Sequence, residues 1–170
     1  MQERTGVVTF QGKPLTLLGP ELRVGDSAPD AVLLDNDLAK VKLSELAGKV
    51  RVIASVPSLD TPVCDTETRR FNEAAAALGP DVAIVTISMD LPFAQKRWCG
   101  AAGIDAVRTL SDHRSAAFGS AYGVLIKGLR LLARAVFVVD AAGVIRYIQL
   151  VRELTDEPDY AAALEAVRLA

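Results

Sequence analysis

The sequence has few of the residues that build metal sites and disulfide frameworks. Its 170 residues include two cysteines and one histidine, so the usual set of about four paired zinc ligands is missing. Two cysteines are also too few for the disulfide framework of a small secreted domain. We therefore expect neither a metal nor another cofactor, and we expect the two cysteines to serve redox chemistry or packing.

A surplus of positive charge and long apolar runs are absent as well. The 19 basic residues face 21 acidic ones, which gives a net charge of −2, and this balance does not favour binding to a phosphate backbone. No apolar run is long enough to cross a bilayer, and residues 1–6 lack the apolar stretch of a signal peptide. These absences predict a cytoplasmic protein that binds neither nucleic acid nor membranes.

The overall composition is that of a folded globular protein. Apolar residues make up 51% of the chain and charged residues 24%, far from the composition of disordered proteins. A chain of this length suits one hydrophobic core, so we predict a single domain over residues 1–170. Within it, residues 1–18 predict a β-hairpin that is added to the N-terminus of the main fold and turns at residues 11–14.

The rest of the chain alternates between strand and helix patterns. Strands are predicted at 31–34, 41–43, 50–56, 82–87, 107–110, 135–139 and 144–150. Helices are predicted at 62–78, 91–99 and 115–119, and from 158 to the C-terminus. This order is typical of an α/β protein with a mixed central sheet and helices on both faces. We predict the thioredoxin-like arrangement, with the apolar strand 50–56 at its centre.

The loop after the central strand carries the strongest chemical signal. If Pro62 is the first helical residue, Thr61 is the N-cap and Cys64 lies in the first turn. The free N–H groups and the dipole of the helix favour a thiolate there, whereas the neighbouring Asp65 carboxylate favours the thiol. Cys64 is therefore either a reactive thiol or an inert buried cysteine. Thr61 either only caps the helix or also binds the sulfur.

Three further residues are candidates for the same chemistry. Cys99 is predicted near the end of its helix, where Gly100 is expected to terminate it; it is either a redox partner or a small filler beside Trp98. Arg134 interrupts an apolar strand, so it either faces water at a strand edge or supplies positive charge to a buried thiolate. His113 is expected to be a solvated loop residue rather than the base of a Cys-His pair.

Pro57, Thr61 and Cys64 follow the pattern of proline, three residues, threonine, two residues and cysteine. This pattern resembles the active-site motif of the peroxiredoxin superfamily. Three further segments are similar to its bacterial thiol peroxidase subfamily: 58–64, 97–100 and 131–136. The N-terminal hairpin also fits this subfamily, so the resemblance covers nearly the whole chain.

The resemblance implies a thioredoxin-dependent enzyme that reduces hydrogen peroxide and organic hydroperoxides, alkyl or lipid, to water and alcohols. It implies that Cys64 is the peroxidatic cysteine, which becomes a sulfenic acid, and that Cys99 is the resolving cysteine, which forms a disulfide with Cys64 in the same subunit. Thr61 and Arg134 would hold the peroxide oxygens, and Pro57 would shield the site. Thioredoxin and a second copy of the chain, in a homodimer, are the implied partners.

The residues leave two other functions open. The chain could be a thioredoxin-like binding module whose cysteines are structural and which has no turnover. It could also be a one-cysteine peroxidase, in which Cys99 only packs and an external thiol reduces Cys64. Peroxide consumption with a thioredoxin system distinguishes an enzyme from a binding module. The mass of the oxidised chain distinguishes the one-cysteine peroxidase, because an internal disulfide lowers the mass by two hydrogens.

Overall fold

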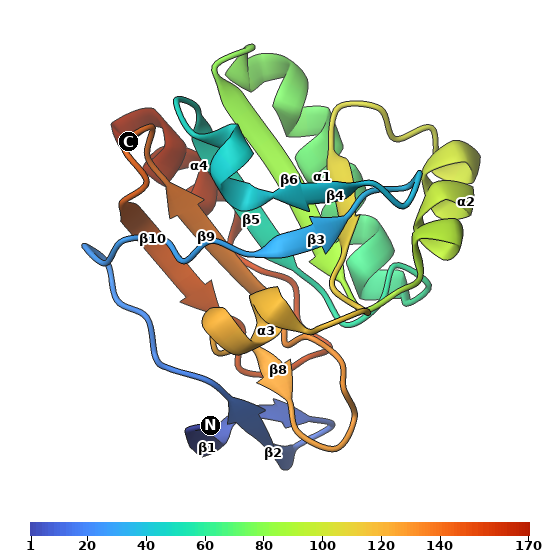
Figure 1. Cartoon of the computed structure of the whole chain (residues 1–170), viewed down its shortest axis with the longest axis vertical. Coiled ribbons are helices and arrows are strands. Elements are labelled where there is room, and N and C mark those ends of the chain that lie inside the picture. The colour runs from blue at the N-terminus through green and yellow to red at the C-terminus, as the bar shows by residue number, and fades with distance from the viewer.

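A computed structural model describes residues 1–170. Its centre is a seven-stranded mixed sheet with the order β10-β9-β5-β6-β7-β3-β4 (Figure 1). These strands are β3 (Val32–Leu34), β4 (Lys40–Lys42), β5 (Val50–Ser55), β6 (Val82–Ser88), β7 (Arg108–Ser111), β9 (Ala135–Val139) and β10 (Ile145–Leu150). A second, three-stranded sheet contains β1 (Glu3–Phe10), β2 (Lys13–Leu18) and β8 (Leu125–Ile126). The predicted α/β class and mixed sheet are confirmed.

Helices lie on both faces of the large sheet (Figure 1). They are η1 (Leu43–Leu46, a 3₁₀ helix), α1 (Pro62–Leu78), α2 (Pro92–Ala102), α3 (Ala117–Ala121) and α4 (Tyr160–Leu169). Successive residues of a strand point to opposite faces, and β5 shows the result: Val52 belongs to the apolar cluster formed with α1 and α4, whereas Ile53 belongs to the cluster that contains α3. Both faces of the sheet are therefore buried.

Strand β5 is the central strand that the sequence predicts. It pairs in parallel with β6 and antiparallel with β9, and its residues 51–55 are all buried. In Figure 1 the arrow of β6 points toward the end of the molecule where the β1–β2 hairpin lies. Because β5 runs parallel to β6, the loop that follows β5 leaves the sheet at that end.

Several local predictions are wrong, including the start of α4, which lies at Tyr160 rather than at residue 158. Helix α2 does not end at Gly100; it continues to Ala102 and ends at Gly103, whose positive φ of 67° suits the left-handed C-cap. Helix α3 begins two residues later than predicted, at Ala117, where the Asp112 carboxylate accepts hydrogen bonds from two backbone N–H groups at the helix start. Strand β8 was not expected at all, because two residues are too short to show a strand period.

The predicted N-terminal hairpin is present, with β1 and β2 paired antiparallel. Its turn contains Gln11 and Gly12, both with positive φ, the backbone conformation that a tight hairpin turn requires. Strand β8 extends the hairpin by pairing with β2, and Val8 and Leu17 are buried in the main core. That the whole chain folds as one domain stays a prediction. No helix has the length and apolar character needed to cross a bilayer.

Candidate active site

Helix α1 places Cys64 where the sequence predicts it. The helix begins at Pro62 with Thr61 as an extended N-cap residue, so Cys64 lies in the first turn. Its side chain is fully buried. The thiol therefore meets its surroundings only through protein groups, and the identity of those groups decides what it can do.

Thr61 does more than end the loop. Its side chain makes no capping hydrogen bond to the helix, which corrects the expectation that the hydroxyl serves the cap. Instead, Thr61 Oγ1 lies 2.7 Å from Cys64 Sγ and 2.9 Å from the carbonyl oxygen of Ser58. A hydroxyl has one proton to donate. It donates to the sulfur of a thiolate, and it can donate to Ser58 when a neutral thiol donates to it.

Arg134 is the second group on the sulfur. Its side chain is almost completely buried, because it directly precedes β9, a strand paired on both sides. The possibility that Arg134 faces water at a strand edge is therefore wrong. Its Nη2 donates to Cys64 Sγ over 3.3 Å. Burial by itself lowers the pKa of Arg134, but the negative charges of Cys64 and Glu67 outweigh it and raise this pKa above its ordinary value.

Two acceptors fix the guanidinium of Arg134. The backbone carbonyl of Leu154 accepts from Nε at 3.1 Å and from Nη2 at 2.9 Å. The carboxylate of Glu67 accepts from Nη1 at 2.5 Å. Because Nη2 also donates to the sulfur, all three nitrogens of the guanidinium make hydrogen bonds. Lysine, with a single nitrogen, cannot reproduce this geometry.

Glu67 is a site residue that the sequence analysis missed. It lies three residues after Cys64 on α1 and is fully buried. Burial raises the pKa of Glu67 to about 7, while the positive charge of Arg134 opposes this rise. Oxygen Oε1 has no hydrogen-bond partner. The available signal was the spacing of three residues, which puts Glu67 and Cys64 on one helix face.

Asp65 does not act on Cys64 as expected. Its Oδ1 accepts from the indole N–H of Trp98 at 2.8 Å, and its Oδ2 accepts from Arg69 Nε at 2.8 Å. The carboxylate is thus neutralised by Arg69 and directed toward helix α2. Its opposition to a thiolate at position 64 is correspondingly reduced, and Arg134 is not needed to offset it.

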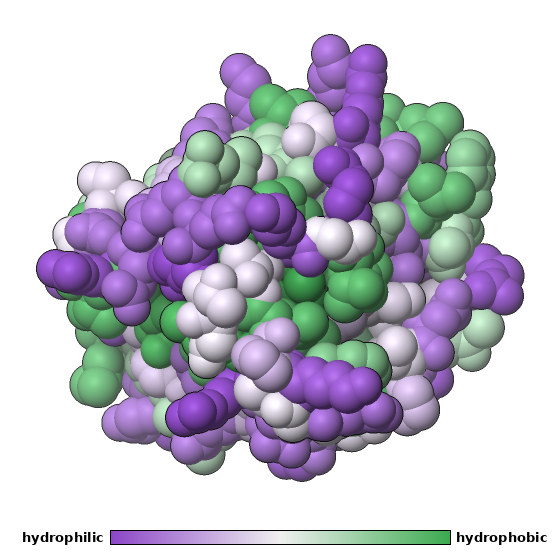
Figure 2. All heavy atoms as spheres, turned by 90° about the horizontal axis from the view of Figure 1, so that it is seen from below, coloured by the Kyte–Doolittle hydropathy of each residue, from purple (hydrophilic) through white to green (hydrophobic).

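A pocket of about 200 Å³ adjoins the groups that hold the sulfur. Three of the predicted site residues line it together: Pro57, Thr61 and Arg134. The rest of its wall is mainly apolar and is formed by Phe10, Pro62, Val63, Leu129, Leu131, Leu154 and Thr155. Seen from the hairpin end, the surface of the molecule shows hydrophobic side chains among hydrophilic ones (Figure 2). A small apolar molecule with one polar end matches this lining.

Cys99 is placed apart from that pocket. Both cysteines are free, and Cys99 is partly exposed. It packs against the apolar cluster that contains Cys64 and Trp98, and its sulfur lies 3.4 Å from Thr109 Oγ1. Cys99 also lines a separate cavity of about 430 Å³. Its resolving role stays a prediction.

His113 is half-buried, with Nδ1 2.9 Å from Ser111 Oγ, so it is less solvated than expected.

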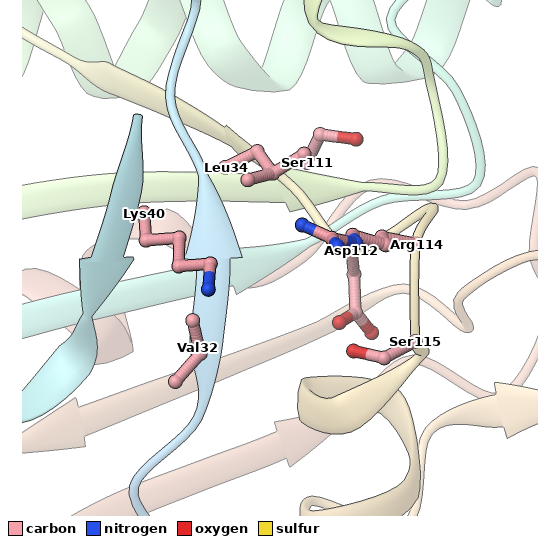
Figure 3. A pocket seen from close by; sticks show the side chains of 7 residues that line it. All are labelled: Val32, Leu34, Lys40, Ser111, Asp112, Arg114 and Ser115. Atoms are coloured by element: carbon pink, nitrogen blue, oxygen red, sulfur yellow. The ribbon is translucent and has the colours of Figure 1, made fainter. Parts of the chain in front are cut away.

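Another cavity, of about 160 Å³, lies beside β3 and β4 (Figure 3). None of the predicted site residues lines it. Its carboxylate, Asp112, is already bonded to the backbone N–H groups of Phe118 and Gly119. The Asp112 side chain is therefore already engaged at the start of α3.

The fold and the surroundings of Cys64 define a class: a thioredoxin-like thiol oxidoreductase whose cysteine is held by a hydroxyl and a guanidinium. Comparison with known proteins agrees. The model of the Redoxin family matches residues 23–164, and the chain belongs to this family and, within it, to the thiol peroxidases of the peroxiredoxins.

Individual relatives cover nearly the whole chain. The thiol peroxidase of Oceanobacillus iheyensis is 60% identical over 157 residues, 92% of this chain and 95% of its own length. That of Bacillus subtilis is 56% identical over 161 residues, 95% and 96% of the two chains. Among solved structures, a peroxiredoxin-like protein of Aquifex aeolicus has a TM-score of 0.90 at 47% identity, covering 98% of this chain and 96% of its own.

Proposed function

We propose that this thiol peroxidase reduces hydrogen peroxide and organic hydroperoxides by attack of Cys64 on the peroxide. The chain is a thiol-specific peroxidase, and its relatives of 52–60% identity are named thiol peroxidases. The observation that carries the role of Cys64 is the pair of donors on its sulfur, Thr61 Oγ1 at 2.7 Å and Arg134 Nη2 at 3.3 Å. Both donors also line the pocket that would admit a peroxide.

The first step forms one bond and breaks one. The thiolate of Cys64 attacks the terminal oxygen of the hydroperoxide, an S–O bond forms, and the O–O bond breaks. The departing alkoxide, or hydroxide from hydrogen peroxide, takes up a proton and leaves as alcohol or water. Negative charge spreads over both oxygens in the transition state, where Arg134 and Thr61 stabilise it. Pro57, buried in the pocket wall, helps to shield the product, a sulfenic acid, from water.

The second step involves Cys99 as resolving cysteine. Its thiolate attacks the sulfur of the sulfenic acid, an S–S bond forms, and the hydroxyl group leaves as water. A dithiol reductant of the thioredoxin type then supplies two electrons and two protons and restores both thiols. Cys64 and Cys99 start on two different helices, which the Trp98–Asp65 hydrogen bond joins, so we expect at least one helix end to open when the disulfide forms.

Substitution of Cys99 by serine tests this role. We expect the variant to consume one equivalent of peroxide in a burst, accumulate sulfenic acid at Cys64, and turn over at least about tenfold more slowly with thioredoxin, since resolution is lost. Stopped-flow peroxide consumption and a sulfenic-acid probe measure both effects. Normal thioredoxin-dependent turnover would instead favour the one-cysteine mechanism with an external thiol.

We also propose that the chain forms a homodimer and works in the cytoplasm, where dithiol reductants are available. Leu91 and Phe93 lie two residues apart at the start of α2 and are exposed by 52% and 65%, and neighbouring exposed apolar side chains are the kind of surface that a second subunit covers. We expect sedimentation at micromolar concentration to give twice the mass of the chain, and Phe93→Glu to give the single mass. A wild-type monomer at every concentration would overturn the dimer.

A further inference from the structure

Glu153 fastens the N-terminal hairpin to the segment that follows β10. Its carboxylate accepts four close hydrogen bonds. The donors are Thr9 Oγ1 at 2.6 Å, Gln11 N at 2.9 Å, Gly12 N at 3.1 Å and Thr155 Oγ1 at 3.1 Å. Three of the four come from the tip of the hairpin. Glu153 is thus the point at which two segments more than 140 residues apart in sequence are joined.

The hydrogen bonds of Glu153 shape the hairpin turn. Gln11 has a φ of 50° and Gly12 a φ of 77°, and a positive φ at a residue other than glycine persists only where the surroundings impose it. Here both N–H groups point at one carboxylate. The hydrogen bond from Thr9 and the two backbone N–H groups hold the pKa of Glu153 at about 2, so the carboxylate is ionised throughout the physiological range.

The segment that Glu153 joins to the hairpin, residues 152–155, contacts the guanidinium of Arg134 through Leu154. Thr9 N donates to the carbonyl of Arg152 at 2.6 Å, and Leu154 N donates to the carbonyl of Thr9 at 2.9 Å. The carbonyl of Leu154 in turn accepts two hydrogen bonds from Arg134, which contacts Cys64. The position of the hairpin therefore sets the position of a backbone oxygen that orients the arginine.

The same tip also borders the pocket. Phe10, which lies between Thr9 and the turn, lines the pocket together with Leu129 and Leu154. Phe10 is 42% exposed, so little besides the hairpin itself holds its ring in place. A displaced tip would change the pocket wall and the acceptor of Arg134 at the same time.

We propose that Glu153 is a positioning residue for peroxide reduction: by fixing the hairpin tip on residues 152–155, it holds the Leu154 carbonyl against Arg134 and Phe10 in the pocket wall. The inference rests on the proposed role of Arg134 at Cys64. It assigns a function to the N-terminal hairpin, which would otherwise be an addition that only stabilises the fold.

Three variants and one control test this role. Glu153→Ala removes all four acceptor contacts, Glu153→Gln keeps one acceptor oxygen, and Thr9→Val removes one donor while it leaves the charge. Glu165→Gln, on α4 and paired only with Arg168 on the surface, controls for the loss of a carboxylate. The readouts are the pH dependence of Cys64 alkylation by iodoacetamide in a Cys99→Ser background, kcat/KM for hydrogen peroxide and for cumene hydroperoxide, and urea unfolding.

We expect Glu153→Ala to shift the alkylation midpoint to higher pH and to lower kcat/KM for hydrogen peroxide about tenfold, since Arg134 loses its fixed geometry. The loss should be larger for cumene hydroperoxide, because Phe10 moves too. Glu153→Gln and Thr9→Val should fall between Glu153→Ala and the wild type, and they remain informative if Glu153→Ala does not fold.

A purely structural role predicts a different result. All Glu153 and Thr9 variants would then lose unfolding free energy, while folded protein kept the wild-type alkylation curve and kcat/KM for both peroxides. That result overturns the proposal. The alkylation curve requires no turnover, so it tests Glu153 even if the wild type proves to have no peroxidase activity, a result that would overturn the proposed role of Cys64 separately.

Discussion

Replacement of Cys64 by serine should abolish peroxide reduction, lowering kcat/KM for hydrogen peroxide by at least about 10⁴-fold, because a hydroxyl at neutral pH is a far weaker nucleophile than a thiolate. Serine is close in shape to cysteine and can accept the same hydrogen bonds from Thr61 and Arg134. The fold should therefore be kept. Peroxide consumption with a thioredoxin system measures the loss, and urea unfolding verifies that the variant is folded.

The matched control for this variant is Cys99→Ser. Both variants lack the disulfide, but only Cys64→Ser should lack the single-turnover burst. If Cys64→Ser kept more than about a tenth of the wild-type rate, the attacking atom would have to be another group, since loss of a covalent nucleophile leaves little chemistry behind. Cys99, the one other thiol in the chain, would then be the first candidate.

Removal of the guanidinium in Arg134→Ala should lower kcat/KM by about 10²-fold to 10³-fold, the range for loss of one fixed donor at a developing charge. The thiolate at Cys64 loses its nearest positive charge as well, so the midpoint of its alkylation should move to higher pH. Stopped-flow kinetics and alkylation against pH measure the two effects. Wild-type values in both assays would reduce Arg134 to a packing role.

The same substitution should also destabilise the fold in a pH-dependent way. Removing one partner of a buried ion pair costs about 3–5 kcal/mol when the other stays charged. Glu67 can escape part of this cost by taking up a proton, because its pKa is already raised to about 7. A raised pKa in the folded state gives stability that is present at low pH and lost as pH rises through that value. We therefore expect urea unfolding to show a larger deficit at pH 8 than at pH 6.

Arg134→Lys separates the charge from the geometry, and Arg168→Ala is the matched surface control. Lysine keeps a positive charge for Glu67 but cannot reach the Leu154 carbonyl, Glu67 and the sulfur together. Most of the unfolding free energy should return, while kcat/KM stays low. Recovery of both would indicate that Arg134 acts as a simple charge.

A comparison of predicted and observed element ends shows which parts of this fold are determined by local sequence. Pro62 and the apolar stripe of α1 predict its two ends correctly, because both are properties of one short segment. The predicted end of α2 at Gly100 is wrong, because two glycines lie within four residues and the sequence does not show which of them takes the left-handed conformation; Gly103 does, and its N–H donates to the carbonyl of Cys99. Strand β8 has only two residues and is defined by its pairing with β2.

The site residues likewise divide into those that local sequence predicts and those that only tertiary contacts bring together. Thr61 and Cys64 could be predicted together because helix geometry brings residues three apart onto one turn. Arg134 could be singled out, since a charge in an apolar strand needs a partner, but its partners Glu67 and Leu154 could not. They become neighbours only when β9, α1 and the segment after β10 meet. Asp65 shows the limit most plainly, because its side chain turns toward Trp98, on another helix.

One of the contacts that orient Arg134 is made by a main-chain atom, the carbonyl oxygen of Leu154. Every amino acid carries this oxygen, so no point substitution at position 154 can delete it. Substitutions there other than proline act through the packing of the side chain, which is buried in the core. A point substitution can therefore remove the contact with Glu67, on the other side of the guanidinium, but it can alter the Leu154 contact only indirectly, as proposed for Glu153, so random mutagenesis would undercount the contacts that hold Arg134. To change the position of the Arg134 guanidinium through Leu154, one has to shift the backbone rather than exchange a side chain. Changes in loop length or in the turn at residues 10–13 would do this.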